Sequence, residues 1–134
     1  MRVEWVPLKR VANFMFGSAV DPYVTDGYLM ALPDEDGVGW RAYGVRGRDM
    51  RVYAEDGEII SIACSDECCL KGRNLIGLPI EDAIEVIGTP PSSEPEQQWI
   101  IHERQTIYYF DEMEAMLWVH RGVVVSITCS HTTE

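Results

Sequence analysis

One stretch of the chain alternates apolar and polar residues with the two-residue period of a β-strand, and a second stretch matches it position by position. In residues 50–54, Met50, Val52 and Ala54 alternate with Arg51 and Tyr53, and the equivalent alternation in residues 115–119 sets Ala115, Leu117 and Val119 against Met116 and Trp118. Asp56-Gly57 and Arg121-Gly122 supply tight turns before the next apolar runs. The pattern predicts eight strands, four in each half of the chain, at residues 28–32, 40–45, 50–54, 58–64, 99–102, 106–110, 115–119 and 123–129.

Two other stretches place apolar residues at the spacing of an α-helix. In residues 78–88 the apolar stripe consists of Ile80, Ala83, Ile84 and Ile87, followed by Gly88. In residues 6–17 it consists of Leu8, Val11, Ala12 and Met15, followed by Gly17. Because proline suits the first turn of a helix and glycine its end, Pro79 and Pro7 strengthen both predictions.

The chain also repeats itself. Residues 50–65 match residues 115–130 at an offset of 65, and residues 6–17 resemble residues 78–88 at an offset of 71–72. Polar or Gly-, Pro- and Ser-rich linkers are expected at 66–77 and 89–97. The sequence therefore predicts an α+β fold in a single domain, 1–134, made of two tandem repeats at about 5–65 and 74–130. Each repeat is one helix plus an antiparallel sheet, with both helices on one sheet face.

Such a sheet leaves its other face free. Alternation predicts an inward set that includes Ile60, Ile62, Cys64, Val125, Ile127 and Cys129. The outward set then includes Arg51, Tyr53, Ser61, Ala63, Met116, Trp118, His120, Ser126 and Thr128. Met116 and Trp118 thus occupy the positions that Arg51 and Tyr53 hold in the first repeat.

Composition and charge limit the classes of partner that the chain is expected to bind. The 134 residues carry a formal net charge of −11, with seven acids and seven bases in residues 1–51 and 15 acids against four bases afterwards. Phosphates would be repelled, so nucleic acid is not expected as a partner, and no apolar run reaches the length of a membrane span. The excess of acids indicates either a solvated acidic surface or a docking surface for a basic protein.

The first residues and the cysteines indicate in which cellular compartment the protein is expected. Residues 1–11 carry charges throughout and lack the apolar core of a secretory signal, so we expect a cytoplasmic protein. Cys64, Cys68, Cys69 and Cys129 are then expected as reduced thiols, with Cys68 and Cys69 half-exposed in a loop.

Sequence motifs for catalysis are sparse. His102, His120 and His131 form no spaced motif, and residues 64–69 supply only a fragment of a zinc site. We therefore expect no enzyme activity, no metal and no cofactor. A nucleophilic Cys68 or Cys69 stays open as an alternative, which a depressed thiol pKa would support.

The outward residues near the second half of the sheet form the candidate binding site. An aromatic centre with a charged rim is typical of protein interfaces. The candidate partner-binding residues are Tyr109, Met116, Trp118, Glu103, Asp111, Glu112 and Glu114. The alternative is that Trp118 packs under the linkers or against the other repeat.

The chain resembles a group of small, acidic bacterial immunity proteins of contact-dependent and other polymorphic toxin systems. The resemblance rests on V-Y-x-x-D-G-x-I-x-S-I at 52–62, G-x-N-L-I-G-L-P-x-E-x-A-I-x-x-I-G at 72–88 and Y-x-F-x-E-x-x-x-x-L-W at 108–118. The helix at 78–88 also resembles those of β-lactamase inhibitor protein, which has two such units in tandem. The resemblance implies that the chain binds and neutralises a cognate toxin, a basic nuclease in our interpretation. A regulatory adaptor without a toxin partner is the alternative.

Overall fold

The computed structural model describes residues 2–33 and 40–131. Four acidic residues included in the charge count above lie outside these ranges: Asp34, Glu35, Asp36 and Glu134. The strands are β1 (Trp5–Val6), β2 (Arg10–Val11), β3 (Phe14–Met15), β4 (Leu29–Ala31), β5 (Arg41–Val45), β6 (Met50–Glu55), β7 (Glu58–Cys64), β8 (Cys69–Leu70), β9 (Arg73–Asn74), β10 (Glu96–Ile100), β11 (Glu103–Phe110), β12 (Ala115–His120) and β13 (Val123–Ser130). The helical segments are α1 (Asp21–Thr25), α2 (Ile80–Ile87) and the 3-10 turn η1 (Asp111–Met113).

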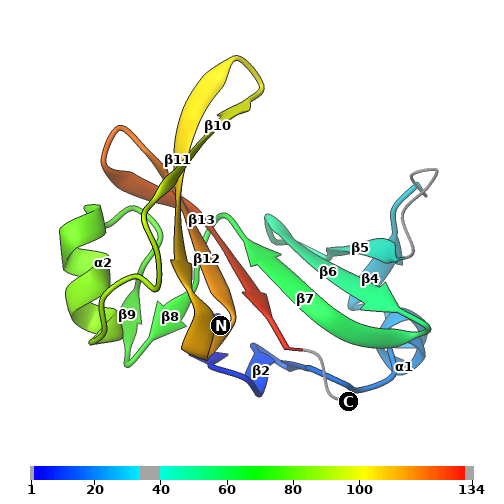
Figure 1. Ribbon diagram of the computed structural model, residues 1–134. Helices are drawn as coiled ribbons and strands as arrows, with labels where there is room; N and C mark the ends of the chain where they lie inside the picture. The colour runs from blue at the N-terminus through cyan, green and yellow to red at the C-terminus, as the bar shows by residue number, and fades with distance from the viewer. Residues whose placement is uncertain (1, 34–39, 132–134) are drawn as a thin grey trace.

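The centre of the fold is one eight-stranded antiparallel sheet (Figure 1). Its strand order is β10-β11-β12-β13-β7-β6-β5-β4, so the two halves of the chain contribute four strands each and meet at the β13–β7 pair. Each half runs as a meander from the edge of the sheet to its centre. The β10–β11 hairpin projects beyond the other strands.

Both central hairpins carry a register shift at matching positions. The β6–β7 pairing shifts between Tyr53 and Ala54, and the β12–β13 pairing shifts between Trp118 and Val119. These positions differ by 65, the offset of the sequence similarity. Because a bulge adds one residue to a strand, it changes which side chain faces the core. Ile59 is therefore fully buried, whereas Ile60, predicted inward, is half-buried.

The same correction applies in the second hairpin. Val124 is 1% exposed and belongs to the core, while Val125, predicted inward, is half-buried. The alternation holds elsewhere: Val52, Leu117 and Ile127 are fully buried, as predicted.

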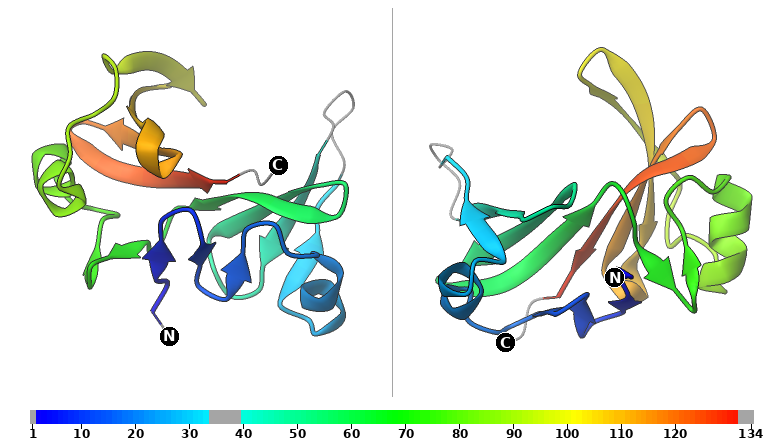
Figure 2. Two further views of the ribbon diagram at one scale, coloured as in Figure 1. Left: turned by 60° about the horizontal axis from the view of Figure 1, so that its bottom comes forward. Right: turned by 180° about the vertical axis from the view of Figure 1, so that it is seen from behind.

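Short segments cover one face of the sheet (Figure 2). The N-terminal strands β1–β3 cross it between α2 and α1, with the β8–β9 hairpin beside α2. The side chains that these segments bury against the sheet include Trp5, Val11, Phe14, Phe16, Val20, Leu70, Leu75, Ile80, Ala83 and Ile87. Burying this much apolar surface is the main stabilising contribution to the fold.

The predicted fold class is wrong. The chain does not form two helix-plus-sheet repeats: its regular structure is mostly antiparallel strands, with helices of only five and eight residues. The predicted helix at 6–17 does not exist. Leu8 and Ala12 have φ angles of 66° and 52°, which an α-helix excludes. The segment instead folds as β1, β2 and β3, joined by tight turns that bury Trp5, Val11 and Phe14.

The second predicted helix is present as α2, and Gly88 ends it with a φ of 85°. The segment that corresponds to it in the first half is α1, which the sequence analysis missed. Ile80 N–H donates to the Gly122 carbonyl, and Val20 N–H donates to the Gly57 carbonyl, so both helices begin beside a central hairpin turn.

The predicted linkers also differ from the structure. Residues 66–77 contain the β8–β9 hairpin and bury Cys68, Cys69 and Leu75. β10 begins at Glu96, inside the second predicted linker, and its turn occupies Ile101 and His102, which were predicted as strand. Within the described residues, neither helix is long and apolar enough to cross a membrane.

Candidate functional site

The face of the sheet opposite the covering segments is the candidate site; we call it the open face. It bears Arg51, Tyr53, Ala63, Met116, Trp118 and Thr128, which pairing and alternation place on one side of β6, β7, β12 and β13. Its centre is lined by small side chains. Ser61 and Ser130 share a hydrogen bond of 2.9 Å across the β7–β13 pair. A centre this shallow leaves room for a partner to approach the sheet.

A hollow of about 380 Å³ lies on the second half of the open face, and we call it the Trp118 hollow. It is lined by Ser65, Ile100, Glu103, Gln105, Trp118, Val125, Ser126 and Thr128. One wall belongs to the projecting β10–β11 hairpin and the floor to β12 and β13. The half-buried Trp118 donates its indole N–H to Thr128 Oγ1 at 3.2 Å, which fixes the ring.

Glu103 brings a carboxylate to this hollow. Its Oε2 accepts a hydrogen bond of 2.9 Å from Gln105 Nε2, and its Oε1 lies 3.3 Å from His120 Nε2. Arg104 points to the other side of the hairpin, where its guanidinium lies 5.3 Å from the centre of the Trp99 ring. The alternation of β11 therefore separates Arg104 from the carboxylate and leaves the hollow acidic.

Tyr109 and Met116 extend the apolar part of the open face. They lie opposite each other in the β11–β12 pair, and both are half-buried. The Tyr109 hydroxyl donates to Glu96 Oε2 at 3.4 Å. Desolvation and the nearby Glu96 carboxylate raise the pKa of the Tyr109 phenol above its ordinary value. The phenol therefore stays protonated at neutral pH, and because its one O–H is donated to Glu96, its oxygen can accept a hydrogen bond from a partner.

The first half of the open face carries a second aromatic group, in which Tyr53 was predicted to point outward but neither Tyr53 nor Trp40 was predicted as a binding residue. The rings of Trp40 and Tyr53 lie 4.6 Å apart, and Trp40 is 43% exposed. Tyr53 occupies the position that Trp118 holds in the second half, as the 65-residue offset indicates. The face thus has aromatic side chains on both sides of its small-residue centre.

The acidic residues predicted at the rim lie apart from the hollow. Asp111, Glu112 and Glu114 are exposed at the turn between β11 and β12. At about 3.3 Å per residue, Asp111 lies about 26 Å along β11 from Glu103. The predicted set of seven residues therefore divides: Glu103, Tyr109, Met116 and Trp118 share the open face, and the other three occupy its far end.

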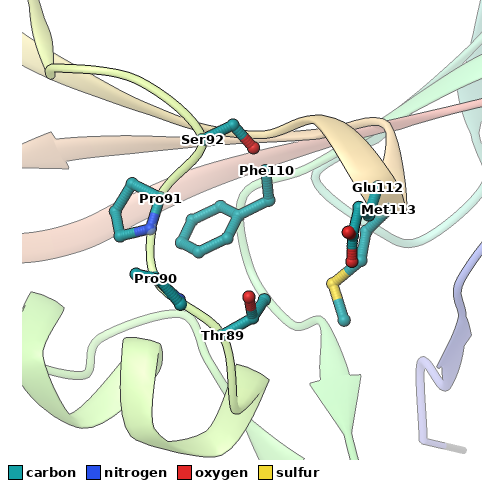
Figure 3. A pocket seen from close by; sticks show the side chains of 7 residues that line it. All are labelled: Thr89, Pro90, Pro91, Ser92, Phe110, Glu112 and Met113. Atoms are coloured by element: carbon teal, nitrogen blue, oxygen red, sulfur yellow. The ribbon is translucent and has the colours of Figure 1, made fainter.

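Local contacts hold this acidic turn. The Asp111 backbone N–H donates to Ser92 Oγ at 2.7 Å, and Glu114 pairs with His131 at 2.6 Å. Glu112 lines a separate pocket of about 210 Å³ beside Phe110 (Figure 3), together with Thr89, Pro90, Pro91, Ser92 and Met113. This pocket lies between the loop that joins α2 to β10 and the end of β11 with η1.

All four cysteines are free and buried, which corrects the expectation that Cys68 and Cys69 are half-exposed. A hydrogen bond with Cys68 and burial raise the pKa of Cys64, and burial raises the pKa of Cys129. The pKa of Cys69 is also raised, by burial and by the Glu67 carboxylate. A raised pKa disfavours the thiolate, which is the reactive form. Across the described residues, no group of three or more His, Cys, Asp or Glu side chains is arranged to hold a metal ion.

Comparison with family models gives no match, and comparison with curated proteins gives none either. The fold is similar to that of a cysteine-rich secretory protein from Staphylococcus aureus subsp. aureus Mu50, with a TM-score of 0.53 and 14% identity. That match covers 98% of this chain and 51% of the other, so this chain spans about half of that protein's length. At this identity the similarity supports the β-rich fold and nothing about activity.

Proposed function

We propose that this protein is a cytoplasmic protein-binding module whose open face receives a basic protein, and that this partner is a toxin domain which it neutralises. The observation that carries the proposal is the Trp118 hollow: an ordered aromatic ring, an apolar wall and a carboxylate lie together on a sheet face that the covering segments leave free. The resemblance to immunity proteins supplies the toxin as the specific partner.

Charge supports a basic partner over a neutral or acidic one. The chain has a net charge of −11, and its excess of acids falls after residue 51. Glu96 and Glu103 project from the β10–β11 hairpin beside the open face, with Asp111, Glu112 and Glu114 at its far end. Complementary charge speeds association and discriminates against acidic proteins.

Exposed apolar side chains on the projecting hairpin add a second contact. Trp99 is 69% exposed, and Ile101 at the hairpin turn is 90% exposed. Large apolar groups at a projecting tip are unfavourable in water and suit insertion against a partner. A partner seated on the open face would reach Ile101 at the hairpin turn, whereas Trp99 lies beside Arg104 on the other side of the hairpin and would contact only a partner that wraps around it.

In this proposal the toxin is neutralised by occlusion of its surface, without a catalytic step. A bound protein would have its basic surface covered by the carboxylates of this chain, which would occupy the positions of its substrate's phosphates. Trp118, Met116 and Tyr109 would form the desolvated centre, where aromatic residues contribute most of the binding energy. We expect salt to weaken the complex mainly by slowing association.

The experiment is an affinity capture from a lysate of the native organism with three baits: the wild type, Ser126→Arg and Thr25→Arg. Ser126 lines the Trp118 hollow, whereas the exposed Thr25 lies in α1, so both variants exchange a hydroxyl for an arginine but only one blocks the face. We expect a basic protein on the wild type and on Thr25→Arg but not on Ser126→Arg.

Growth then tests the toxin assignment. Expression of the captured protein's domain in a bacterial host should arrest growth, and co-expression of the wild-type chain should restore it. A captured protein that Ser126→Arg retains equally would contradict the binding face. A captured protein that binds the face but leaves growth unchanged would favour a regulatory adaptor over an immunity protein.

A further inference from the structure

The Trp118 hollow has the size and lining for one long side chain. Its volume of about 380 Å³ is at the lower end of the ~300–1,000 Å³ range that holds small ligands. Trp118, Ile100 and Val125 supply apolar walls along which methylene groups can pack. Glu103 and three hydroxyls, from Ser65, Ser126 and Thr128, supply the polar lining.

The charge of the hollow specifies a cation. Among the described residues, the Glu103 carboxylate contacts Gln105 and His120, neither of which carries a permanent charge. Both contacts hold the carboxylate in place beside the hollow without the neutralising effect of a lysine or arginine. An ionised carboxylate accepts up to about four hydrogen bonds, so acceptor capacity remains for an incoming donor.

The geometry favours arginine over lysine. A guanidinium is planar, stacks on aromatic rings and carries five N–H donors, whereas an ammonium is a compact and strongly hydrated charge. Trp118 offers the ring, Glu103 the carboxylate, and the surrounding hydroxyls accept the remaining donors. Gln105 donates through its amide nitrogen, which leaves its carbonyl oxygen as a further acceptor. An arginine already lies over a tryptophan ring on the opposite side of the same hairpin, where the Arg104 guanidinium is 5.3 Å from the centre of the Trp99 ring.

We infer that the Trp118 hollow receives an arginine side chain of the bound protein, held between the Trp118 ring and the Glu103 carboxylate. The inference rests on the proposed function only in assigning that arginine to a protein partner. The hollow itself is tested without any partner.

The test uses the full chain, labelled with nitrogen-15, and N-acetyl-L-arginine amide as the probe. The matched probe is N-acetyl-L-citrulline amide, in which an uncharged urea replaces the guanidinium. We follow the indole N–H signal of Trp118, assigned by its loss in Trp118→Phe. The arginine probe should shift this signal saturably in the millimolar range, and the citrulline probe should leave it in place.

Two variants test whether the Glu103 carboxylate binds the guanidinium of the probe. Glu103→Gln should weaken the binding of the arginine probe about tenfold, as expected for the loss of one charge-assisted contact. Glu85→Gln, an exposed position in α2, should leave it unchanged. Equal shifts from both probes, or equal binding by both variants, would overturn the inference. If the arginine probe does not bind while capture of a basic protein still depends on Ser126, the proposed function stands and the arginine assignment is wrong. If the arginine probe binds but no basic protein is captured, the arginine assignment stands and the proposed function is wrong.

Discussion

Ala63 lies directly opposite Thr128 where the two halves of the sheet meet in the β7–β13 pair. The two residues differ by 65 in number, so each is the counterpart of the other. The same pairing sets Ile62 against Cys129 and Cys64 against Ile127, which exchange under the same offset. The open face therefore has a single centre at Ala63 and Thr128, with an aromatic group on either side.

The register shift in the β6–β7 pair makes Ile59, rather than Ile60, the core residue, and mutation tests this difference. Ile59→Ala should lower the free energy of unfolding by about 2–5 kcal/mol, because Ile59 is fully buried and its removal leaves a cavity. Ile60→Ala, at a half-buried position, should cost about 1 kcal/mol. Urea unfolding of the two variants measures the difference. A larger loss for Ile60→Ala would restore the register predicted by simple alternation.

The end of α2 depends on the backbone of Gly88. Gly88→Ala should destabilise the protein by about 1–2 kcal/mol, since its φ of 85° strains any residue with a Cβ atom. Gly44→Ala is the control: its φ is ordinary, and the added Cβ would lie 3.5 Å from Leu32 Cδ2, a normal contact. Thermal unfolding should rank Gly88→Ala below Gly44→Ala, and equal melting temperatures would refute this assignment.

The buried thiols predict a loss of stability in alkali. Cys64 has a pKa raised above its ordinary value of 9.0, through its hydrogen bond with Cys68 and through burial. Above about pH 9 the unfolded chain releases this proton while the folded chain keeps it. The unfolded state then binds fewer protons, so the free energy of unfolding falls as pH rises.

Each such thiol contributes up to about 1.4 kcal/mol per pH unit. Cys64→Ala should therefore flatten the decline between pH 9 and pH 10.5 relative to the wild type, whatever its effect at pH 7. Chemical denaturation across this range provides the measurement. Parallel curves for the two proteins would show that Cys64 titrates alike in both states.

Charge reversal separates the two acidic regions of the second half. Glu103→Lys, in the Trp118 hollow, should both slow association with the captured partner and speed dissociation. Reversing Asp111, Glu112 and Glu114 together should slow association at low salt and leave dissociation nearly unchanged, because exposed charges act mainly on the encounter. Surface plasmon resonance resolves both rates. Unchanged kinetics in the triple variant would remove the acidic turn from the proposed interface.

The sequence predicted the strands better than the helices, for a physical reason. Alternation in residues 50–54 and 115–119, with Gly57 and Gly122 at the turns, reports directly on a sheet with one buried face. The spacing of Leu8, Val11, Ala12 and Met15 also fits a helix, but Leu8 and Ala12 have the positive φ angles of tight turns. Tertiary packing of the β1–β3 segment overrode that local pattern.

The candidate site was predictable only in part. Outward positions such as Met116 and Trp118 followed from the repeat, and the structure places both on the open face. The hollow depends on the β10–β11 hairpin, which projects beyond the other strands (Figure 1) and contributes Glu103 and Ile100 to the same lining as Trp118. Residues 96–98 are polar and lack apolar alternation, so the extent of β10 was not apparent.

The affinity of the purified partner for three proteins tests most directly whether the open face binds a basic protein. The wild type and Thr25→Arg should bind alike, and Ser126→Arg should bind about 30-fold or more weakly, equivalent to about 2 kcal/mol. Circular dichroism and unfolding curves would establish that both variants are folded. Equal affinity of a folded Ser126→Arg variant would contradict the account and place the partner on another surface.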